Sequence, residues 1–365
     1  MGNSMSGALA WPVAMVFLML GVSSQASAQE DDPLSRPAQP YARAERAVLM
    51  DVVRTDKRLV AVGEQGIVLV SDDNGRQWRQ AQVSSSVALT RVVFASSQQG
   101  WAVGHSGVVL HSEDHGDNWS TRLDGVQAAQ LELTAAQAQN DNSERARRRL
   151  RNAEFLVKDG PDKPFLDVLF TDEQHGWVVG AYGLVFATAD GGYTWQSLMG
   201  AVDNPKGLHF YRILADGQTI FLVGEQGLLL RSDDHGRSFN ALPSPYKGSL
   251  FGLARGDATT LVAYGLRGHA LRSNDDGQEW QAVTLEQSDT LTADARLADG
   301  SLLLADETGR VLRSTDDGRA FAALKLAPQG YIAGLVQAAD GAVVVVGARG
   351  LARIEPAQLQ LESTP

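Results

Sequence analysis

The chain has 365 residues, with 32 lysine and arginine against 43 aspartate and glutamate residues, which gives a formal net charge of −11. This acidic balance disfavours nucleic acid as the main partner, because phosphate recognition requires a basic face. The chain has no cysteine, which excludes disulfides, thiolate nucleophiles and cysteine-ligated zinc. It has 37 glycines, above the usual share of about 7%. This excess requires many turns and favours an all-β fold.

The N-terminal segment has the pattern of an export signal. Residues 1–28 carry no charge, and the apolar run over residues 8–22 has the length of a signal-peptide core. Ala26-Ser27-Ala28 offers a cleavage site. The sequence therefore predicts cleavage after Ala28 and a periplasmic mature protein, with an uncleaved membrane anchor as the alternative. Residues 29–46 are polar and contain three prolines, so we expect an exposed segment there.

A short apolar strand followed by Gly-x-x-Gly recurs through the rest of the chain. The motifs begin at Gly63, Gly104, Gly180, Gly224, Gly265, Asp306 and Gly347. The successive spacings are 41, 76, 44, 41, 41 and 41 residues, so the second interval exceeds the period by 35. We expect each motif to be a tight hairpin, because glycine adopts positive φ without steric cost. The sequence thus contains seven copies of one unit with a single insertion.

A second motif, Ser/Thr-x-Asp-x-Gly-x-x-Trp/Phe, follows the first in six copies. Its aspartates are Asp73, Asp114, Asp190, Asp234, Asp275 and Asp316, and its closing aromatics are Trp78, Trp119, Trp195, Phe239, Trp280 and Phe321. Hydroxyl and carboxylate oxygens at this spacing can accept backbone N–H groups within the turn. These aspartates are therefore predicted to stabilise turns and not to form six catalytic sites. The seventh copy reads LARIEPAQ after Gly350 and lacks the motif.

Each unit supplies an upstream strand, a strand on either side of Gly-x-x-Gly, and a strand after the aromatic residue. Four strands per ~40 residues, repeated around an axis, are typical of a β-propeller. We therefore predict an all-β, seven-bladed propeller with four-stranded blades over residues 47–365. The ring is expected to close either through the tail QLQLE or through residues before Val48, and the sequence favours neither.

The second motif is the Asp-box, or bacterial neuraminidase repeat. Combined with units such as GWAVGHSG at a 41-residue period over residues 47–356, it resembles the photosystem II stability and assembly factor family of seven-bladed propellers. The resemblance implies a non-catalytic lumenal or periplasmic factor that holds membrane-protein intermediates during assembly. It implies a membrane or envelope complex as partner, such as a photosystem component. We expect no metal or cofactor and a monomeric chain. A periplasmic accessory protein of a transporter is an alternative.

The insertion at about residues 126–158 is rich in helix-forming residues and predicts a helical hairpin. Residues 126–160 have a net charge of +1, whereas the rest of the mature chain carries −12. The segment contains Arg145, Arg147, Arg148, Arg149 and Arg151. These arginines are candidates for docking an acidic partner or an anionic lipid surface, and a solvated helical face is the alternative.

Four charged residues occupy equivalent places on successive upstream strands, namely Asp51, Arg91, Asp167 and Arg212. Their alternating signs predict ion pairs between blades, with a ligand or partner site and catalysis as the alternatives. Asp-box propellers include sialidases and other glycoside hydrolases, which require paired carboxylates. The Arg-Ile-Pro signature of sialidases is absent, and the nearest string is Arg353-Ile354-Glu355-Pro356 at the other end of the chain. A glycoside hydrolase or glycan-binding propeller therefore stays as the alternative function.

Overall fold

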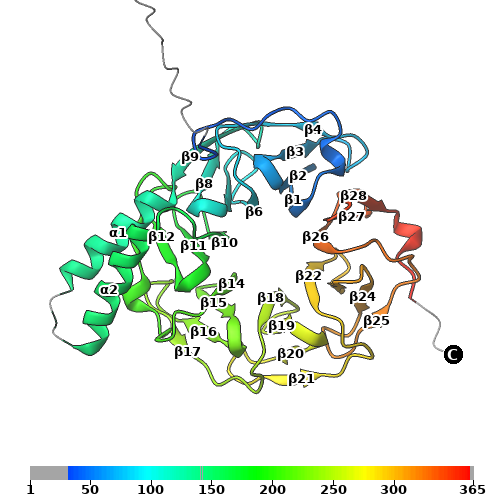
Figure 1. Ribbon diagram of the computed structural model, residues 1–365. Coiled ribbons are helices and arrows are strands. Elements are labelled where there is room, and N and C mark those ends of the chain that lie inside the picture. Colours follow the sequence, from blue (N-terminus) through cyan, green and yellow to red (C-terminus); the bar gives the residue numbers. More distant parts are fainter. Residues whose placement is uncertain (1–31, 140, 142, 362–365) are drawn as a thin grey trace, which may run out of the picture. The chain divides into compact units, whose positions relative to one another are not determined.

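The computed structural model describes residues 32–139, 141 and 143–361, and the propeller is the compact unit from Pro33 onward. Its strands form seven sheets placed around a central axis (Figure 1). Five sheets have four strands, one has five and one has three. The prediction of an all-β propeller that carries two helices is confirmed. The predicted signal peptide lies outside the described residues.

The sheets follow one another in chain order. The first sheet contains β1 (Leu49–Thr55), β2 (Arg58–Gly63), β3 (Val68–Ser71) and β4 (Arg79–Gln80). The second contains β5 (Gln82–Val83), β6 (Leu89–Phe94), β7 (Gly100–Gly104), β8 (Val109–Ser112) and β9 (Asn118–Leu123). The third contains β10 (Phe165–Phe170), β11 (Gly176–Gly180), β12 (Val185–Thr188) and β13 (Gln196–Ser197). The next two contain β14 (Phe210–Asp216), β15 (Thr219–Gly224), β16 (Leu229–Ser232) and β17 (Asn240–Ala241); and β18 (Leu250–Arg255), β19 (Leu261–Gly265), β20 (Ala270–Ser273) and β21 (Gln281–Val283). The last two contain β22 (Leu291–Arg296), β23 (Leu302–Asp306), β24 (Val311–Ser314) and β25 (Ala322–Ala323); and β26 (Ile332–Gln337), β27 (Val343–Gly347) and β28 (Gly350–Ile354).

The apolar strand before each Gly-x-x-Gly motif lies in the middle of its sheet and is almost wholly buried. Both of its faces contact neighbouring sheets, which explains its continuous run of apolar residues. Seven apolar clusters fill the seven spaces between adjacent sheets, including the space between the last sheet and the first. Burial between sheets therefore stabilises the ring.

In five units the Gly-x-x-Gly motif is a 3-10 turn, whereas in the seventh it is the expected tight hairpin, in which Gly347 pairs with Gly350. In the first unit the two strands are joined by a 3-10 turn, η2 (Glu64–Gly66), and Gly66 has φ of +70°. Gly63, in contrast, has φ of −168°, which any residue can adopt. A Cβ atom on Gly63 would lie 2.2 Å from the Val48 carbonyl oxygen. The first glycine is thus required by the close approach of the backbone, and our explanation by positive φ was wrong for this position.

The six Asp-box turns share one hydrogen-bond pattern. In the first, the Ser71 hydroxyl donates to Asp73 (2.9 Å) and accepts from the Gly75 N–H (2.9 Å). The Asp73 carboxylate also accepts from the Gln77 N–H at 2.8 Å, and the Trp78 indole donates to the Gly75 carbonyl at 3.1 Å. The equivalent hydroxyl, carboxylate and glycine contacts recur in the other five turns. These contacts keep the carboxylates within their own turns.

Ring closure follows neither expected route. The tail pairs with the sixth sheet, through Leu361 and Leu324, and not with the seventh. No residue before Val48 forms a strand in the part of the chain that the structure describes. The first and last sheets instead meet through an apolar cluster and through Arg353, which donates to the Asn74 carbonyl at 2.7 Å. The seventh sheet therefore has three strands and not the four that we expected.

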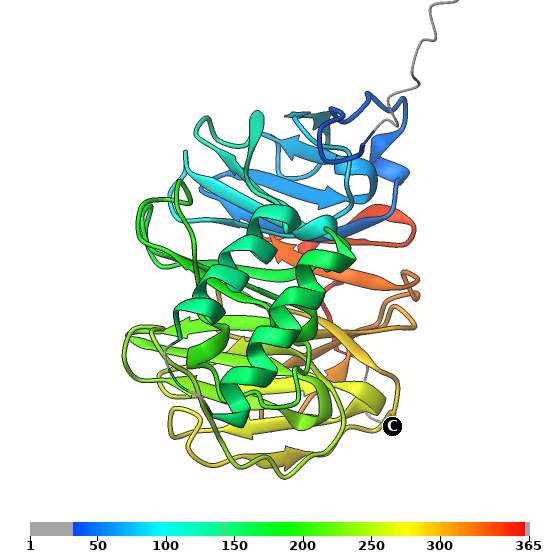
Figure 2. The ribbon, with the colours of Figure 1, turned by 60° about the vertical axis from the view of Figure 1, so that its left-hand side comes forward.

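The insertion forms two helices, α1 (Gly125–Ala138) and α2 (Glu144–Asp159), at the outer edge of the ring (Figures 1 and 2). Asp124 caps α1 by accepting from the Gln127 N–H, and Ser143 caps α2. Within the described ranges, neither helix is long and apolar enough to span a bilayer, and no other helix is.

Candidate functional site

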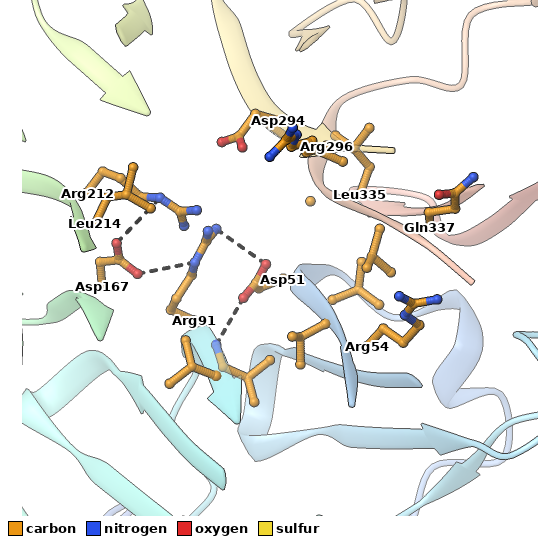
Figure 3. A pocket seen from close by; sticks show the side chains of 18 of the residues that line it. Asp51, Arg54, Arg91, Asp167, Arg212, Leu214, Asp294, Arg296, Leu335 and Gln337 are labelled. Carbon is orange, nitrogen blue, oxygen red and sulfur yellow. Dashed lines mark hydrogen bonds and ion pairs between the residues drawn. The ribbon is translucent and has the colours of Figure 1, made fainter. Parts of the chain in front are cut away.

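A cavity of about 700 Å³ lies on the axis and is lined by the first strands of six sheets, β1, β6, β10, β14, β22 and β26. Figure 3 shows its charged side chains. They comprise four arginines and three aspartates, namely Asp51, Arg54, Arg91, Asp167, Arg212, Asp294 and Arg296. The cavity wall thus carries a formal excess of one positive charge in an otherwise acidic chain.

A repeated irregularity in the first strands determines which residues share one level of the cavity. In each sheet the register between the first and second strands shifts just before this level, as between Leu49 and Asp51 in β1. The equivalent residues around the ring are Asp51, Arg91, Asp167, Arg212, Gly252, Ala293 and Gly334. The four predicted residues therefore do come together, on one side of the axis, and small residues occupy the other side.

Arg91 lies between two carboxylates and joins three sheets (Figure 3). Its Nη1 atom is 3.3 Å from Asp51 Oδ1, and its Nε atom is 3.2 Å from Asp167 Oδ1. Each carboxylate also accepts a backbone N–H from the next charged strand, Asp51 from Val92 at 3.0 Å and Asp167 from Ile213 at 2.7 Å. Asp51 and Asp167 are thus both bound to Arg91.

Burial shifts the protonation equilibria of this network. Burial raises the pKa of Asp167 to about 7, and the nearby Arg91 only partly opposes this rise. Burial likewise raises the pKa of Asp51, against the opposing effect of Arg91. Burial alone would lower the pKa of Arg91, but the carboxylates of Asp51 and Asp167 raise it, so the guanidinium stays charged. Because these carboxylates are desolvated and lie next to a fixed cation, any further charge that enters the cavity would shift their pKa values.

Two arginines of the cavity have unused hydrogen-bonding capacity. The Arg212 Nε atom is buried and has no hydrogen-bond partner in the described structure, and its nearest carboxylate oxygen, on Asp167, is 3.8 Å away. Arg54 is exposed at the cavity wall and makes no ion pair with any described residue. A buried donor without an acceptor is costly, so Arg212 favours an anionic group as ligand.

Asp294 and Tyr264 also belong to this cavity network, although the sequence did not single them out. The Tyr264 hydroxyl donates to Asp294 at 2.6 Å. The Tyr264 ring occupies the space that a Cβ on Gly252 would enter, 1.9 Å from the nearest ring atom. The sequence signal that could have revealed them lies in the fifth unit. There LVAYG stands where the first unit has LVAVG, and Gly252 stands where the first four units have a charged residue. Burial raises the pKa of Asp294 and of Tyr264.

The arginines of the insertion are far from the cavity, on the outer edge of the ring. Arg149 forms a buried ion pair with Glu132, 2.8 Å between Nη2 and Oε2, and Ser197 donates to the same carboxylate. Arg145 donates to the carbonyls of Gly200 and Val202. Arg149 thus joins α2 to α1, whereas Arg145 and the Ser197–Glu132 hydrogen bond hold the hairpin on the propeller. Arg147, Arg148 and Arg151 are exposed, so the structure divides the predicted basic cluster into two groups.

The described residues contain no group of three or more histidine, aspartate or glutamate side chains that could hold a metal ion. The charged lining of the cavity offers charge recognition by arginine and buried aspartate.

Comparisons with known proteins connect this fold to one family. The family model described as "Photosynthesis system II assembly factor YCF48" matches residues 15–113 and 156–357. A 77-residue segment, 21% of this chain, is 34% identical to "Photosystem II assembly lipoprotein Ycf48" of Synechococcus sp. (strain CC9902). That segment covers 23% of the relative, so the chain matches less than a quarter of the relative's length.

Solved structures show the same fold at low sequence identity. A structure described as "YCF48 bound to D1 peptide" is 17% identical, with a TM-score of 0.61, and covers 88% of this chain and 99% of its own. YCF48 from Cyanidioschyzon merolae is 16% identical, with the same TM-score and the same coverage. The WD40 β-propeller domain of Doa1 is 11% identical, with a TM-score of 0.60, and covers 89% and 98%. Because the family model covers most of the sequence, this chain belongs to the Ycf48 family of photosystem II assembly factors.

Proposed function

We propose that this chain is an exported, non-catalytic scaffold that holds an extended segment of a membrane protein while a membrane or envelope complex assembles. The family description supports a role in assembly, and one similar structure is described as bound to a D1 peptide. Export is inferred from the uncharged, apolar start of the chain, and the relative from Synechococcus is described as a lipoprotein. We infer that the seven sheets are the predicted seven blades and that the Asp-boxes are structural.

The observation that carries this proposal is the Arg212 guanidinium in the axial cavity, which donates no hydrogen bond to a described residue and approaches only one carboxylate, Asp167, at 3.8 Å. Arg212 is only 16% exposed, and its Nε donor lacks an acceptor in the described structure. Arg54 adds a second cation at the same cavity wall. A carboxylate from an extended peptide would bind Arg212, because arginine binds carboxylates through paired, charge-assisted hydrogen bonds, and Arg54 would attract the same client from elsewhere on the wall. We therefore assign the cavity to a carboxylate of the client, either a chain terminus or an acidic side chain.

The aspartates limit which ligands the cavity accepts. Asp51 and Asp167 would repel an anion if both were charged and free, but each is paired with Arg91. The raised pKa of Asp167 lets this residue take up a proton near neutral pH when an anion arrives. A carboxylate that binds Arg212 can therefore leave the two ion pairs of Arg91 in place.

The test uses the full chain and peptides that tile the D1 protein, each prepared as a free acid and as an amide. We expect at least one peptide to bind, and Arg212→Gln and Arg54→Gln to weaken its binding about tenfold or more. Arg237→Gln, a substitution on an exposed Asp-box turn, is the control. Equal binding by wild type and both cavity variants, measured by fluorescence polarisation, would disprove the cavity site. Absence of binding by every peptide would remove D1 as the client.

A further inference from the structure

Among the residues that the structure describes, the seventh sheet lacks the outer strand that the other sheets have. In the first six sheets the third strand is paired on its outer side with a further strand, namely β4, β9, β13, β17, β21 or β25. In the seventh sheet the third strand is β28, and among the described residues no strand pairs with its outer edge. Figure 1 shows β28 at the rim of the ring.

The missing contact can be located at one carbonyl group. In four other sheets an aliphatic residue of the outer strand donates its N–H to the same position of the third strand, over distances of 2.8–2.9 Å: Ala81 to Val68, Leu198 to Val185, Leu242 to Leu229, and Leu324 to Val311. The pairing of Val346 with Leu351 makes Leu351 the equivalent of Val68, which pairs with Val62. In the described part of the chain the Leu351 carbonyl receives no hydrogen bond from outside its own hairpin.

Exposure agrees with this open edge. All four residues of β3 are buried, whereas the three middle residues of β28 are half-buried. Alternate residues of an edge strand direct their N–H and C=O groups away from the sheet, here Leu351 and Arg353. An edge of this kind is a ready template for another strand.

Neither described end of the propeller chain pairs with β28 as a strand, although the 3-10 turn η1 (Ala44–Arg46) packs against the start of β28 beside Gly350. The tail turns away after η8 (Pro356–Gln358) and reaches the sixth sheet, where the Lys325 backbone N–H donates to the Gln360 carbonyl at 2.9 Å. At the other end, the Ala38 N–H donates to the Val83 carbonyl at 3.0 Å in the second sheet. The loss of the Asp-box after β28 explains the absence of an outer strand, because this box is the turn that returns the chain in the other units.

We propose that the outer edge of β28 binds an extended peptide segment of a partner protein, which adds to the seventh sheet as its fourth strand. The chain's own outer strands define what fits. An aromatic residue directly precedes five of these strands, and an aliphatic residue lies three positions after it: Trp78 and Ala81, Trp195 and Leu198, Phe239 and Leu242, Trp280 and Val283, and Phe321 and Leu324. The partner segment therefore carries an aromatic-x-x-aliphatic sequence in extended form. Main-chain hydrogen bonds supply the affinity, and the apolar side chains supply the specificity.

Apolar groups beside the edge support this choice of ligand. Ala352 and Leu359 are partly buried against the cluster between the sixth and seventh sheets, and Leu351 packs against the cluster between the seventh and first. Arg353 is engaged by Asp340 and Glu355, so it does not repel an incoming strand as a free edge cation would. The site is separate from the axial cavity and does not depend on it.

The test is titration of the full chain with a fluorescent peptide that copies residues 278–285, which include Trp280 and Val283. We expect saturable binding. Methylation of the backbone nitrogen of the valine that copies Val283 should weaken binding of the peptide at least tenfold, because this N–H would donate to the Leu351 carbonyl. Leu351→Pro should abolish binding, whereas Leu351→Ala, which keeps the edge N–H, should retain it. The methylated peptide keeps the test decisive even if the proline variant does not fold.

Hydrogen exchange provides an independent measurement on the unmodified chain. The amides of Leu351 and Arg353 should exchange faster than those of Ala270 and Arg272, their equivalents in the fifth sheet, which pair with Val283 and Gln281, and should become protected when the peptide binds. Protection of both pairs in the free monomer would disprove the open edge, as would equal binding of the methylated peptide. A dimer in light scattering that Leu351→Pro dissociates would overturn the assignment to a peptide in favour of a second copy of this chain.

Discussion

The Asp234 carboxylate accepts four hydrogen bonds inside its turn. The donors are the hydroxyls of Ser232 and Ser238, each at 2.7 Å, and the backbone N–H groups of Arg237 and Ser238, each at 3.0 Å. Its neighbour Asp233 is 68% exposed and forms an ion pair with Arg231 at 2.7 Å. The two aspartates are adjacent in sequence but differ in the contacts they make, so they form a matched pair for mutation.

Asp234→Ala should lower the free energy of unfolding by about 2–3 kcal/mol. A hydrogen bond contributes about 0.5–1.5 kcal/mol net, and the exposed side of the turn lets water replace part of the loss. Asp233→Ala should cost less than about 1 kcal/mol, because exposed ion pairs contribute little. Urea unfolding of the two variants and the wild type measures the difference. Equal costs for the two substitutions would refute the structural role of the box.

The pH dependence of the same variant gives a second check. Burial opposes the charge on Asp234, but hydrogen bonds from Ser238, Ser232 and Arg237 lower its pKa from 3.8 to about 2. A lowered pKa in the folded state stabilises the protein above the unfolded value and loses this contribution as pH falls through the folded value. The difference between wild type and Asp234→Ala should therefore shrink between about pH 4 and pH 2. A difference that stays constant over this range would contradict the assignment.

Two further predictions concern buried charges. Burial raises the pKa of Asp167 to about 7 in spite of Arg91, so the folded chain holds this proton more tightly than the unfolded chain. The wild type should lose stability as pH rises from about 4 to 7, and Asp167→Asn should lose less; identical slopes in urea unfolding would argue against this. Arg149→Ala leaves the Glu132 carboxylate buried without its cation, which costs about 3 kcal/mol or more. Hydrogen exchange in α1 and α2 should then accelerate. The control Arg147→Ala, at an exposed position, should have no effect. Equal exchange rates in the two variants would show that the Arg149–Glu132 pair does not stabilise the hairpin.

Local spacing was sufficient for much of the fold. The Gly-x-x-Gly period and the Asp-box indicated the strands and their turns, because both motifs act over a few residues of backbone. The insertion was expected at about residues 126–158, and the helices run from Gly125 to Ala138 and from Glu144 to Asp159. For the same reason, repeat positions alone were enough to predict that Asp51, Arg91, Asp167 and Arg212 occupy equivalent places on successive strands.

Contacts between distant parts of the chain decided the rest. The sequence showed alternating charges, but only the assembled ring placed Arg91 between two carboxylates and left the Arg212 Nε donor without an acceptor among the described residues. The pairing of Tyr264 with Asp294 depends on a space left by a glycine in a different strand.

Ring closure could not be predicted for a related reason. The tail had two edges available, and the choice of the sixth sheet over the seventh depends on packing energies that no local motif records. The sequence by itself thus determined the repeating unit, since short-range backbone chemistry governs it. The tertiary structure alone decided which charges remain unpaired and which strand edge remains open, since both depend on what neighbouring units place against them.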